Sequence, residues 1–295
     1  MMKQRIPLYL FILLFFCFPA SDARGFSFPV PNIPHLDTAT KAAKEVSKAQ
    51  RPISDEEEYY IGRAVAAKIL SSYPLLEHRA LTAYVNLVGQ TMALHSDTPQ
   101  TYGGYHFAIL DTNEINAFAC PGGTILITKG MIDATRNEDE LAAVLAHEVA
   151  HIHNRDGIAS IKSARRTEAL TVMGTEAARS YTPAQVSQLV RIFEGSVEDV
   201  FKTLVVNGYG RSQEYQADET ALRYLSRAGY NPASLRDFLL ALAAQDTTTS
   251  GGILKTHPGT AERIENVNAY ATSSWKPNES IVRARTARFN VVLRK

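Results

Sequence analysis

The sequence predicts an α+β domain that is mostly helical and has a small antiparallel or mixed sheet beside a central helix. Three observations support this prediction. Several long segments repeat apolar residues at spacings of three and four, as one face of a helix does. Two short apolar runs flank Pro121-Gly122-Gly123, as strands flank a turn. The chain is 45% hydrophobic and 21% charged over 295 residues, which is enough apolar material for a large core.

Residues 1–23 are predicted to be a signal peptide. Lys3 and Arg5 form a short basic region, Ile6 to Phe18 is apolar, and Ser21-Asp22-Ala23 supplies small residues before a cleavage site. The apolar run, at about 13 residues, is shorter than the roughly 20 that a membrane-spanning helix needs. We therefore expect an exported protein whose mature chain has no transmembrane segment and a single cysteine.

Three further parts are predicted beyond the signal peptide. Residues 24–52 are rich in proline and form a leader or linker. Residues 53–272 form the folded domain, and residues 273–295 form a basic tail. We expect a solvated end for this tail, with weak contact to an acidic surface as the alternative. The formal net charge of the whole chain is +1, so nothing favours nucleic acid as a partner.

The domain is predicted to begin with two helices and a strand. Ser54 and Glu57 form a capping box ahead of apolar residues at helical spacing. A second helix is predicted for about Glu77 to His95. Gly103-Gly104 interrupts the pattern, and the apolar run Tyr105–Leu110 then predicts a strand.

Residues 116–128 are predicted to form a hairpin, because Pro121-Gly122-Gly123 has turn chemistry. Two interpretations remain open for its strands. They are either plain core strands, or they offer an unpaired sheet edge that can bind an extended peptide through its main chain. Cys120 has no cysteine to pair with in the mature chain, and we interpret it as a structural turn residue rather than a nucleophile.

The central helix is predicted over Glu138–His153, with Asn137 as its N-cap and acidic residues in its first turn. His147 and His151 are four residues apart, so both imidazoles lie on one face and can bind one Zn²⁺. Glu148 lies about 100° around the axis from His147, on the flank where a metal-bound water would project. A general base is needed there.

A helix whose histidines merely face solvent is the alternative to a metal site. His153 lies on another side of the helix, and we interpret it as a surface residue or one that supports a ligand. Residues 158–208 predict further helices, interrupted by glycines and a proline, with Arg165-Arg166 on a solvated face.

A later helix is predicted from Arg211 to about Gly229. Its apolar stripe includes Glu214 and Asp218, which lie one turn apart. A buried acidic pair needs a counter-charge, which either a metal or a salt bridge to Arg211 or Arg263 can supply. Residues 247–252 form a flexible link, and another helix begins near His257-Pro258.

Four segments together resemble a known pattern: His147-Glu148-x-x-His151; Glu214-x-x-x-Asp218 preceded by Arg211; His257-Pro258 followed by Arg263; and Asn116-Ala-Phe-Ala ahead of Pro-Gly-Gly. Over about Ser54–Ala271 the sequence closely resembles the gluzincin zinc metallopeptidases that include HtpX and the CAAX prenyl endoprotease. It looks most like the soluble, exported BepA/LoiP-like branch, but without a tetratricopeptide repeat region. The fold that the resemblance implies is a zincin-like peptidase domain over 53–272.

The resemblance implies a role for each matching residue. His147, His151 and Glu214 would bind one zinc ion per chain, and Glu148 would be the general base. Asp218 would hydrogen-bond a ligand histidine and hold its orientation. In this mechanism Glu148 takes a proton from a zinc-activated water and delivers it to the leaving amine.

The resemblance also implies residues for substrate binding and for the transition state. The edge strand that pairs with substrate would consist of Asn116, Ala117, Phe118 and Ala119. His257 and Arg263 would stabilise the oxyanion. Because His257 lies on a glycine-flanked loop, we add a hypothesis: in a latent state it replaces the catalytic water on zinc. Changing His257 to alanine would then raise activity or leave it unchanged, and complete loss would favour the oxyanion role.

We therefore expect a zinc endopeptidase of the bacterial cell envelope, located in the periplasm, that acts on misfolded or unassembled polypeptides. The sequence leaves open a peripheral association with an envelope membrane. One alternative is a chaperone-like binding module that uses zinc structurally and captures extended chains without cleaving them. Another is a helical scaffold without metal.

Overall fold

The computed structural model describes the following residues: 52–162, 183–245, 253–258, 260–270, 275–276 and 278–293. The predicted signal peptide and nearly all of the proline-rich leader lie outside these ranges, as do Arg165-Arg166 and the link at 247–252. Among the described helices, none combines the length and apolar character that crossing a membrane requires.

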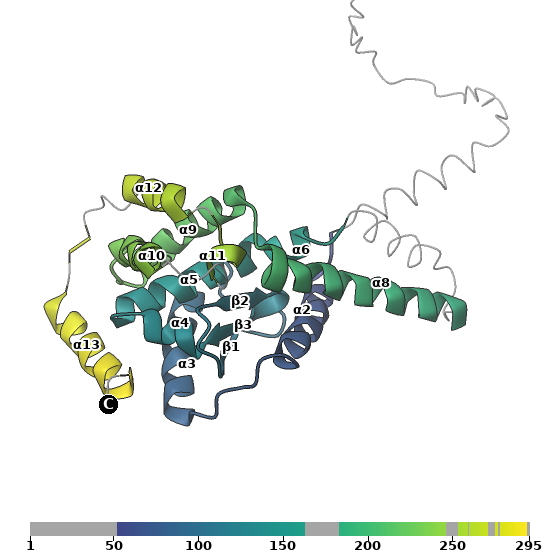
Figure 1. Ribbon diagram of the computed structural model, residues 1–295, viewed down its shortest axis with the longest axis horizontal. Helices are drawn as coiled ribbons and strands as arrows, with labels where there is room; N and C mark the ends of the chain where they lie inside the picture. Colours follow the sequence, from purple (N-terminus) through teal and green to yellow (C-terminus); the bar gives the residue numbers. More distant parts are fainter. Residues whose placement is uncertain are drawn as a thin grey trace, which may run out of the picture. The chain divides into compact units, whose positions relative to one another are not determined.

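The described part of the chain is mainly helical (Figure 1). Its elements, in chain order, are α2 (Asp55–Leu70), α3 (Arg79–Leu94), β1 (His106–Leu110), β2 (Ala117–Cys120), the 3-10 turn η1 (Pro121–Gly123), β3 (Thr124–Thr128), α4 (Lys129–Ala134), α5 (Glu138–Asn154), α6 (Asp156–Ala159), α8 (Pro183–Lys202), the π-helical turn η2 (Thr203–Asn207), α9 (Arg211–Arg227), α10 (Ala233–Gln245), α11 (Ile253–Thr256), α12 (Thr260–Tyr270) and α13 (Glu279–Leu293). The predicted α+β class is confirmed.

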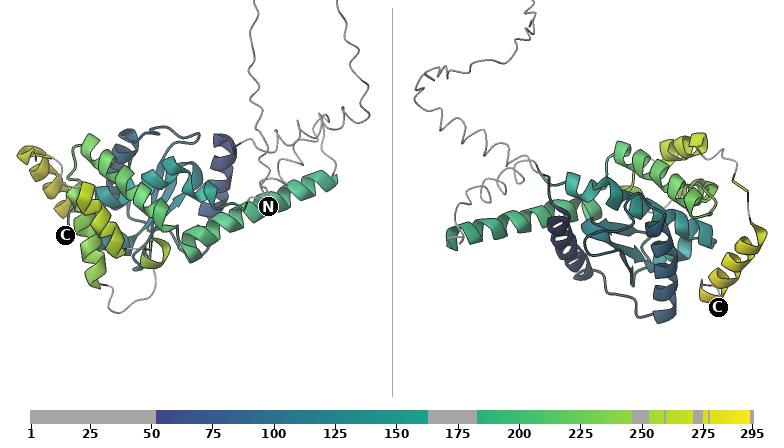
Figure 2. Two further views of the ribbon diagram at one scale, coloured as in Figure 1. Left: turned by 90° about the horizontal axis from the view of Figure 1, so that it is seen from above. Right: turned by 180° about the vertical axis from the view of Figure 1, so that it is seen from behind.

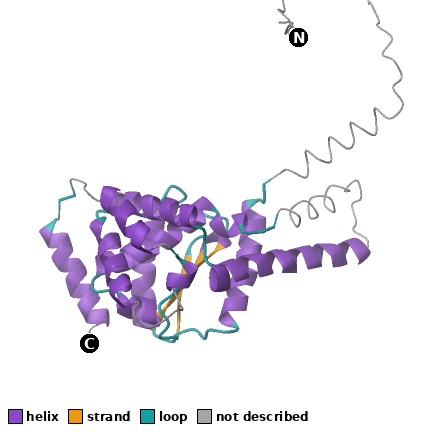
Figure 3. Ribbon diagram, turned by 45° about the horizontal axis from the view of Figure 1, so that its top comes forward, coloured by secondary structure: helices purple, strands orange, loops and turns teal. Residues whose placement is uncertain are grey.

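The predicted hairpin is present as β2 and β3, which pair antiparallel with Phe118 opposite Leu126. Gly122 and Gly123 at its turn have φ of +77° and +112°, a region that favours glycine. β1 pairs parallel to β3 on the other side, so the sheet is mixed, with β3 in the centre and β2 at an edge. Figure 3 shows this sheet enclosed by helices.

Helices cover both faces of the sheet, and two apolar cores result. Ile125 and Ile127 face the larger core with residues of α3, α5, α9 and α10. Leu126 and Phe118 face the other core with residues of α2, α8 and η2. Because successive strand residues point to opposite faces and both faces are buried, the strands need unbroken apolar runs.

Two predicted helix starts have the expected caps. In α2, the Ser54 hydroxyl accepts a hydrogen bond from the Glu57 backbone N–H, and the Glu57 carboxylate accepts one from the Ser54 N–H. In α5, the Asn137 side chain accepts from the Glu140 N–H. Each cap satisfies backbone donors that the first turn leaves without partners.

The C-terminal region differs from the predicted solvated end. Residues 279–293 form α13, which lies on the side of the domain away from α8 (Figure 2). Phe289 is 2% exposed and belongs to the larger core. Arg288 pairs with the buried Glu138, and Arg285 pairs with Asp139 at 3.3 Å. The acidic first turn of α5 is therefore the surface that the basic segment contacts.

Changing Phe289 to alanine is expected to lower the free energy of unfolding by about 3–5 kcal/mol, because a fully buried aromatic side chain is removed from the core. The matched control is Val291→Ala on the same helix, where a side chain that is 58% exposed should contribute less than about 0.5 kcal/mol. Urea unfolding measures both. Equal, small effects would mean that α13 does not stabilise the domain.

Candidate metal centre

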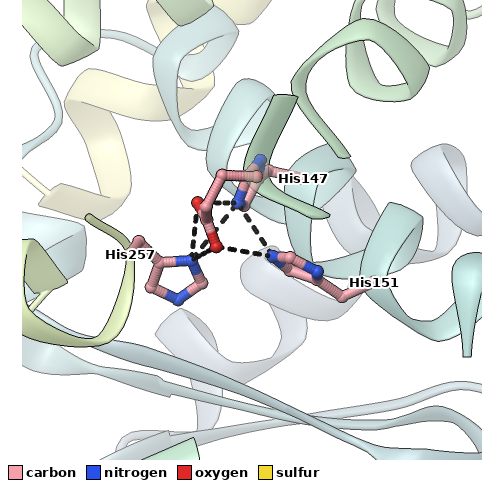
Figure 4. Close-up of side chains that lie close together, drawn as sticks. His147, His151 and His257 are labelled. Atoms are coloured by element: carbon pink, nitrogen blue, oxygen red, sulfur yellow. Dashed lines mark hydrogen bonds and ion pairs between the residues drawn. The ribbon is translucent and has the colours of Figure 1, made fainter. Parts of the chain in front are cut away.

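Three elements bring four metal-binding side chains to one point. α5 carries His147 and His151, α9 packs against it and carries Glu214, and His257 follows α11. Figure 4 shows the three imidazoles converging. All four residues are at most 4% exposed. The arrangement joins two helices that are separated by more than fifty residues in the sequence.

The spacing of the donor atoms fits a tetrahedral metal. His147 Nε2 lies 3.1 Å from His151 Nε2, 3.3 Å from His257 Nδ1 and 3.4 Å from Glu214 Oε2. Donors bound to zinc at about 2.0–2.1 Å in a tetrahedron are separated by about 3.3 Å. Histidine nitrogens and a carboxylate are also the donor types that zinc binds in catalytic sites. The four residues therefore fit a zinc ion.

His151 is held by a carboxylate that the sequence analysis does not find. Its Nδ1 lies 2.7 Å from Asp156 Oδ2, and the side chain of Gln213 donates to the other oxygen of Asp156. Arg155 ends α5 in the left-handed region at φ 58°, and this turn places Asp156 beside the helix. Burial alone would lower the pKa of His151, but Asp156 and Glu214 raise it to about 10 in the metal-free chain.

Asp218 lies beside Nδ1 of His147, as Asp156 lies beside Nδ1 of His151. Asp218 Oδ1 lies 2.9 Å from His147 Nδ1, although the angle falls short of a good hydrogen bond. Asp218 is 1% exposed. Burial would raise the pKa of Asp218, but the Arg263 guanidinium beside it lowers that pKa to about 2. Asp218 is thus an anion beside His147, which the resemblance implies as a zinc ligand.

Arg263 lies behind the donors and pairs with the two buried acidic residues of α9, Glu214 and Asp218. Its Nη1 lies 2.9 Å from Glu214 Oε2, and its Nε and Nη2 donate to Asp218 at 2.8 and 2.7 Å. Burial raises the pKa of Glu214, but His257 and Arg263 together hold it well below its usual range. Arg211, the other arginine considered, instead pairs with Glu262 at the surface.

These contacts bear on the oxyanion roles that the resemblance implies. Arg263 has its guanidinium directed at two carboxylates, so the structure shows a counter-charge for the acidic pair. His257 lies among the metal donors, with Nδ1 at 3.0 Å from Glu214 Oε1. Its Nε2 lies 3.9 Å from Glu148 Oε1. The geometry is compatible with His257 as a fourth ligand.

Glu148 is next to the donors but outside the donor set. It is 1% exposed, and its Oε2 has no hydrogen-bond partner within the described ranges. A buried carboxylate oxygen without a donor is costly unless a water or a substrate satisfies it. The flank of α5 predicted for a general base therefore holds a buried carboxylate, with one oxygen that no described side chain or backbone group contacts by a hydrogen bond.

The edge strand predicted to bind substrate lies beside the loop of His257. Asn116 Oδ1 accepts hydrogen bonds from the Ala117 N–H at 2.9 Å and from the Thr256 hydroxyl at 3.2 Å. The Ile253 N–H donates to the Ile115 carbonyl at 2.8 Å. Asn116, Ala117, Phe118 and Ala119 are all buried. The structure thus places this strand at a sheet edge, with α11 attached to its beginning.

Tyr209 is a further site residue that motif reasoning does not identify. Its ring stacks on His151 with centroids 4.2 Å apart and planes inclined by 27°. Its N–H donates to the Thr256 carbonyl at 3.0 Å, which connects the segment before α9 to the segment of His257. No local spacing signals this contact, because Tyr209 lies 58 residues after His151 in the chain.

Two other residues singled out in the sequence lie outside the donor set. His153 is partly buried, and its Nδ1 lies 2.7 Å from the Thr98 hydroxyl. Cys120 is fully buried at the end of β2, and burial raises the pKa of its thiol. A buried thiol with a raised pKa is a poor nucleophile, which agrees with a structural role.

Comparison with known proteins identifies related chains. Residues 79–271 match the model of peptidase family M48. A beta-barrel assembly-enhancing protease of Yersinia pestis is 28% identical over 79% of this chain and 47% of its own length. Metalloprotease YcaL of Escherichia coli (strain K12) is 24% identical over 55% of this chain and 60% of its own. A protease HtpX homolog of Salinibacter ruber is 29% identical over 55% of this chain and 67% of its own. The chain spans about half the length of the beta-barrel assembly-enhancing proteases that it matches.

Proposed function

The chain belongs to peptidase family M48, and from this premise we propose that it is a zinc-dependent endopeptidase of the bacterial cell envelope that hydrolyses misfolded or unassembled proteins. The observation that carries the proposal is the position of Glu148. A buried carboxylate with an unsatisfied oxygen lies beside four donors at tetrahedral spacing. A purely structural zinc site would not need such a carboxylate next to it.

Each residue around the site has a separate task in this proposal. His147, His151 and Glu214 would hold zinc, which supplies an acidified water and a Lewis acid for the peptide carbonyl. Glu148 takes the proton of the attacking water and delivers it to the leaving nitrogen. Asp156 and Asp218 fix the orientation of the two imidazoles from behind.

The substrate in this proposal is an extended polypeptide. Main-chain pairing to the edge of β2, at Asn116–Ala119, would hold it without reading its sequence, which suits clients that share only an unfolded state. An envelope location, in the periplasm, is supported by the signal peptide predicted at 1–23. It is also supported by the names of the relatives, which refer to the assembly of β-barrels. A peripheral contact with an envelope membrane is compatible with this location.

Removal and return of the metal tests the proposal directly. The purified chain is expected to contain one zinc ion and to cleave an unfolded polypeptide such as casein. A chelator should stop cleavage, and stoichiometric zinc should restore it, because hydrolysis requires the acidified water. Elemental analysis and a gel-based cleavage assay measure the two properties. A chain that binds zinc but cleaves nothing would support the chaperone-like binding module instead.

A latent state held by His257 is part of the proposal. Three protein ligands leave one zinc position for water, whereas four close it. His257 Nδ1 lies 3.0–3.3 Å from Glu214 and His147, at the place where a fourth ligand would be. The water could enter only after His257 moves away, and this would restrain the protease between substrates.

His257→Ala is therefore expected to raise the rate of peptide cleavage or to leave it unchanged. The measurement is kcat/KM on a peptide substrate, with the zinc content of the variant determined in parallel. A complete loss of cleavage in a variant that retains zinc would contradict the latch. It would favour the oxyanion role that the resemblance implies for His257.

A further inference from the structure

The residue that ends α5 has an uncommon backbone conformation. Arg155 has φ 58° and ψ 33°, in the left-handed region, and within the described ranges it is the one residue other than glycine with a positive φ. Glycine commonly takes this place after a helix, because a residue with a Cβ is strained there. Such strain persists only where the surrounding contacts hold the conformation. The arginine side chain is therefore expected to make contacts that a glycine could not make.

A buried carboxylate of α2 holds the side chain of Arg155. Glu58 is 5% exposed, and its Oε2 lies 2.7 Å from Nη2 of Arg155. The same guanidinium nitrogen donates to the Ile53 carbonyl at 2.6 Å, just before α2 begins. The other oxygen of Glu58 accepts from the Gly122 N–H at 3.2 Å, at the turn of the hairpin. Because Glu58 is buried, the loss of its charge affects Arg155 more than the loss of an exposed partner would.

The turn at Arg155 brings a carboxylate back to the metal centre. Asp156 follows directly, and its Oδ2 lies 2.7 Å from Nδ1 of His151. Gln213 of α9 donates to the other oxygen of Asp156 at 3.0 Å. If Arg155 took an extended conformation, the chain would leave α5 in another direction and Asp156 would move away from His151. His151 would then lose the group that fixes the orientation of its imidazole.

We propose that Glu58 is a positioning residue of the metal centre, which acts on His151 through Arg155 and Asp156. The inference rests on the zinc binding in the proposed function. Glu58 is not one of the four donors. Its task is to keep Arg155 in the left-handed region, so that Asp156 stays bonded to His151 and the imidazole is already oriented when zinc binds. No motif signals this role, because Glu58 lies in a different helix much earlier in the chain.

Glu58→Gln tests the first step of this chain of contacts. The amide oxygen can still accept from the Gly122 N–H, whereas the charge that holds Arg155 is removed. The zinc dissociation constant is expected to rise about tenfold or more, the usual effect of losing a group that orients a ligand. Competition with a chromophoric chelator measures it. The matched control is Asp55→Asn: Asp55 also pairs with Arg155, at 3.4 Å, but its side chain is 80% exposed, so zinc affinity should be unchanged.

A pair of substitutions at Arg155 tests the conformation itself. Both remove the guanidinium, but glycine adopts the left-handed region without strain and alanine does not. Arg155→Ala is therefore expected to weaken zinc binding about as much as Glu58→Gln does, while Arg155→Gly stays within about threefold of wild type. In the Arg155→Gly background, adding Glu58→Gln should weaken zinc binding no further, because Glu58 has then lost the residue through which it acts.

Urea unfolding of each metal-free variant shows whether it is folded under the conditions of the zinc measurement. Where a single variant does not fold, the double variant Glu58→Gln/Arg155→Gly replaces it, because this variant has no unpaired buried charge at the pair. Its zinc affinity should lie within about threefold of wild type, and a loss of about tenfold would overturn the proposal.

Three other results would also overturn the positioning role of Glu58. Glu58→Gln could leave zinc affinity unchanged, or weaken it by the same factor in both backgrounds, or Arg155→Gly could weaken it as much as Arg155→Ala. Zinc binding with the expected coupling in a chain that cleaves no polypeptide would overturn the endopeptidase proposal alone. A folded chain that binds no zinc would overturn both.

Discussion

Replacing Glu148 with glutamine is expected to reduce kcat/KM for peptide hydrolysis by about 10²- to 10⁴-fold, the contribution typical of a general acid–base. One zinc ion per chain should still bind, because Glu148 lies outside the donor set of His147, His151 and Glu214. The amide has nearly the shape of the carboxylate but cannot take a proton from water. Cleavage kinetics and elemental analysis of the same preparation measure the two effects separately.

The matched control for this substitution is Glu219→Gln. Glu219 lies on α9, close in sequence to Glu214, but its side chain is 47% exposed and pairs with Arg223 at the surface. This variant should retain wild-type cleavage and zinc content. If Glu148→Gln were to cleave as fast as Glu219→Gln, Glu148 would not be the general base. If it lost cleavage but its function in cells were undiminished, the binding-module alternative would gain support.

Residue spacing within one helix predicted part of the candidate metal centre, whereas the rest depends on how distant helices pack together. The positions of His147 and His151 on one helical face follow from their spacing alone. Their meeting with Glu214 depends on how α5 packs against α9, which no spacing within either helix encodes. The resemblance supplied that pairing, and the structure brings the three side chains together.

The features that sequence reasoning did not find are those that depend on chain direction and on distant partners. Asp156 lies just beyond the end of α5, and only the left-handed conformation of Arg155 turns it back towards His151. The parallel pairing of β1 with β3 requires the chain to cross over between them, which a hairpin signal does not contain.

The C-terminal segment also differs from what its composition predicted. Its basic residues predicted a solvated end, yet Phe289 lies in the core and Arg288 contacts Glu138. An Arg-rich helix can place one apolar face inward while its charges meet acids elsewhere in the fold. Composition alone does not distinguish this arrangement from a free tail.

Arg263→Met is expected to lower the free energy of unfolding of the metal-free chain by about 3–5 kcal/mol, because it leaves the buried carboxylates of Glu214 and Asp218 without their counter-charge. The loss should be smaller with zinc bound, since the ion then supplies positive charge beside Glu214. Urea unfolding with and without chelator measures both values. The matched control, Arg211→Met, removes an exposed pair with Glu262 and should cost less than about 1 kcal/mol.

The pH dependence of the stability difference between wild type and Arg263→Met shows whether the difference arises from the charge of Asp218. Arg263 helps to depress the folded-state pKa of Asp218 from 3.8 to about 2. A depressed carboxyl pKa stabilises the fold above the unfolded value and ceases to do so as pH falls through the folded one. The gap between wild type and Arg263→Met in the metal-free state should therefore narrow between about pH 4 and pH 2. A variant with unchanged stability at neutral pH but a large loss of kcat would instead show that Arg263 acts on the transition state, because a counter-charge for buried acids cannot be removed without cost to folding.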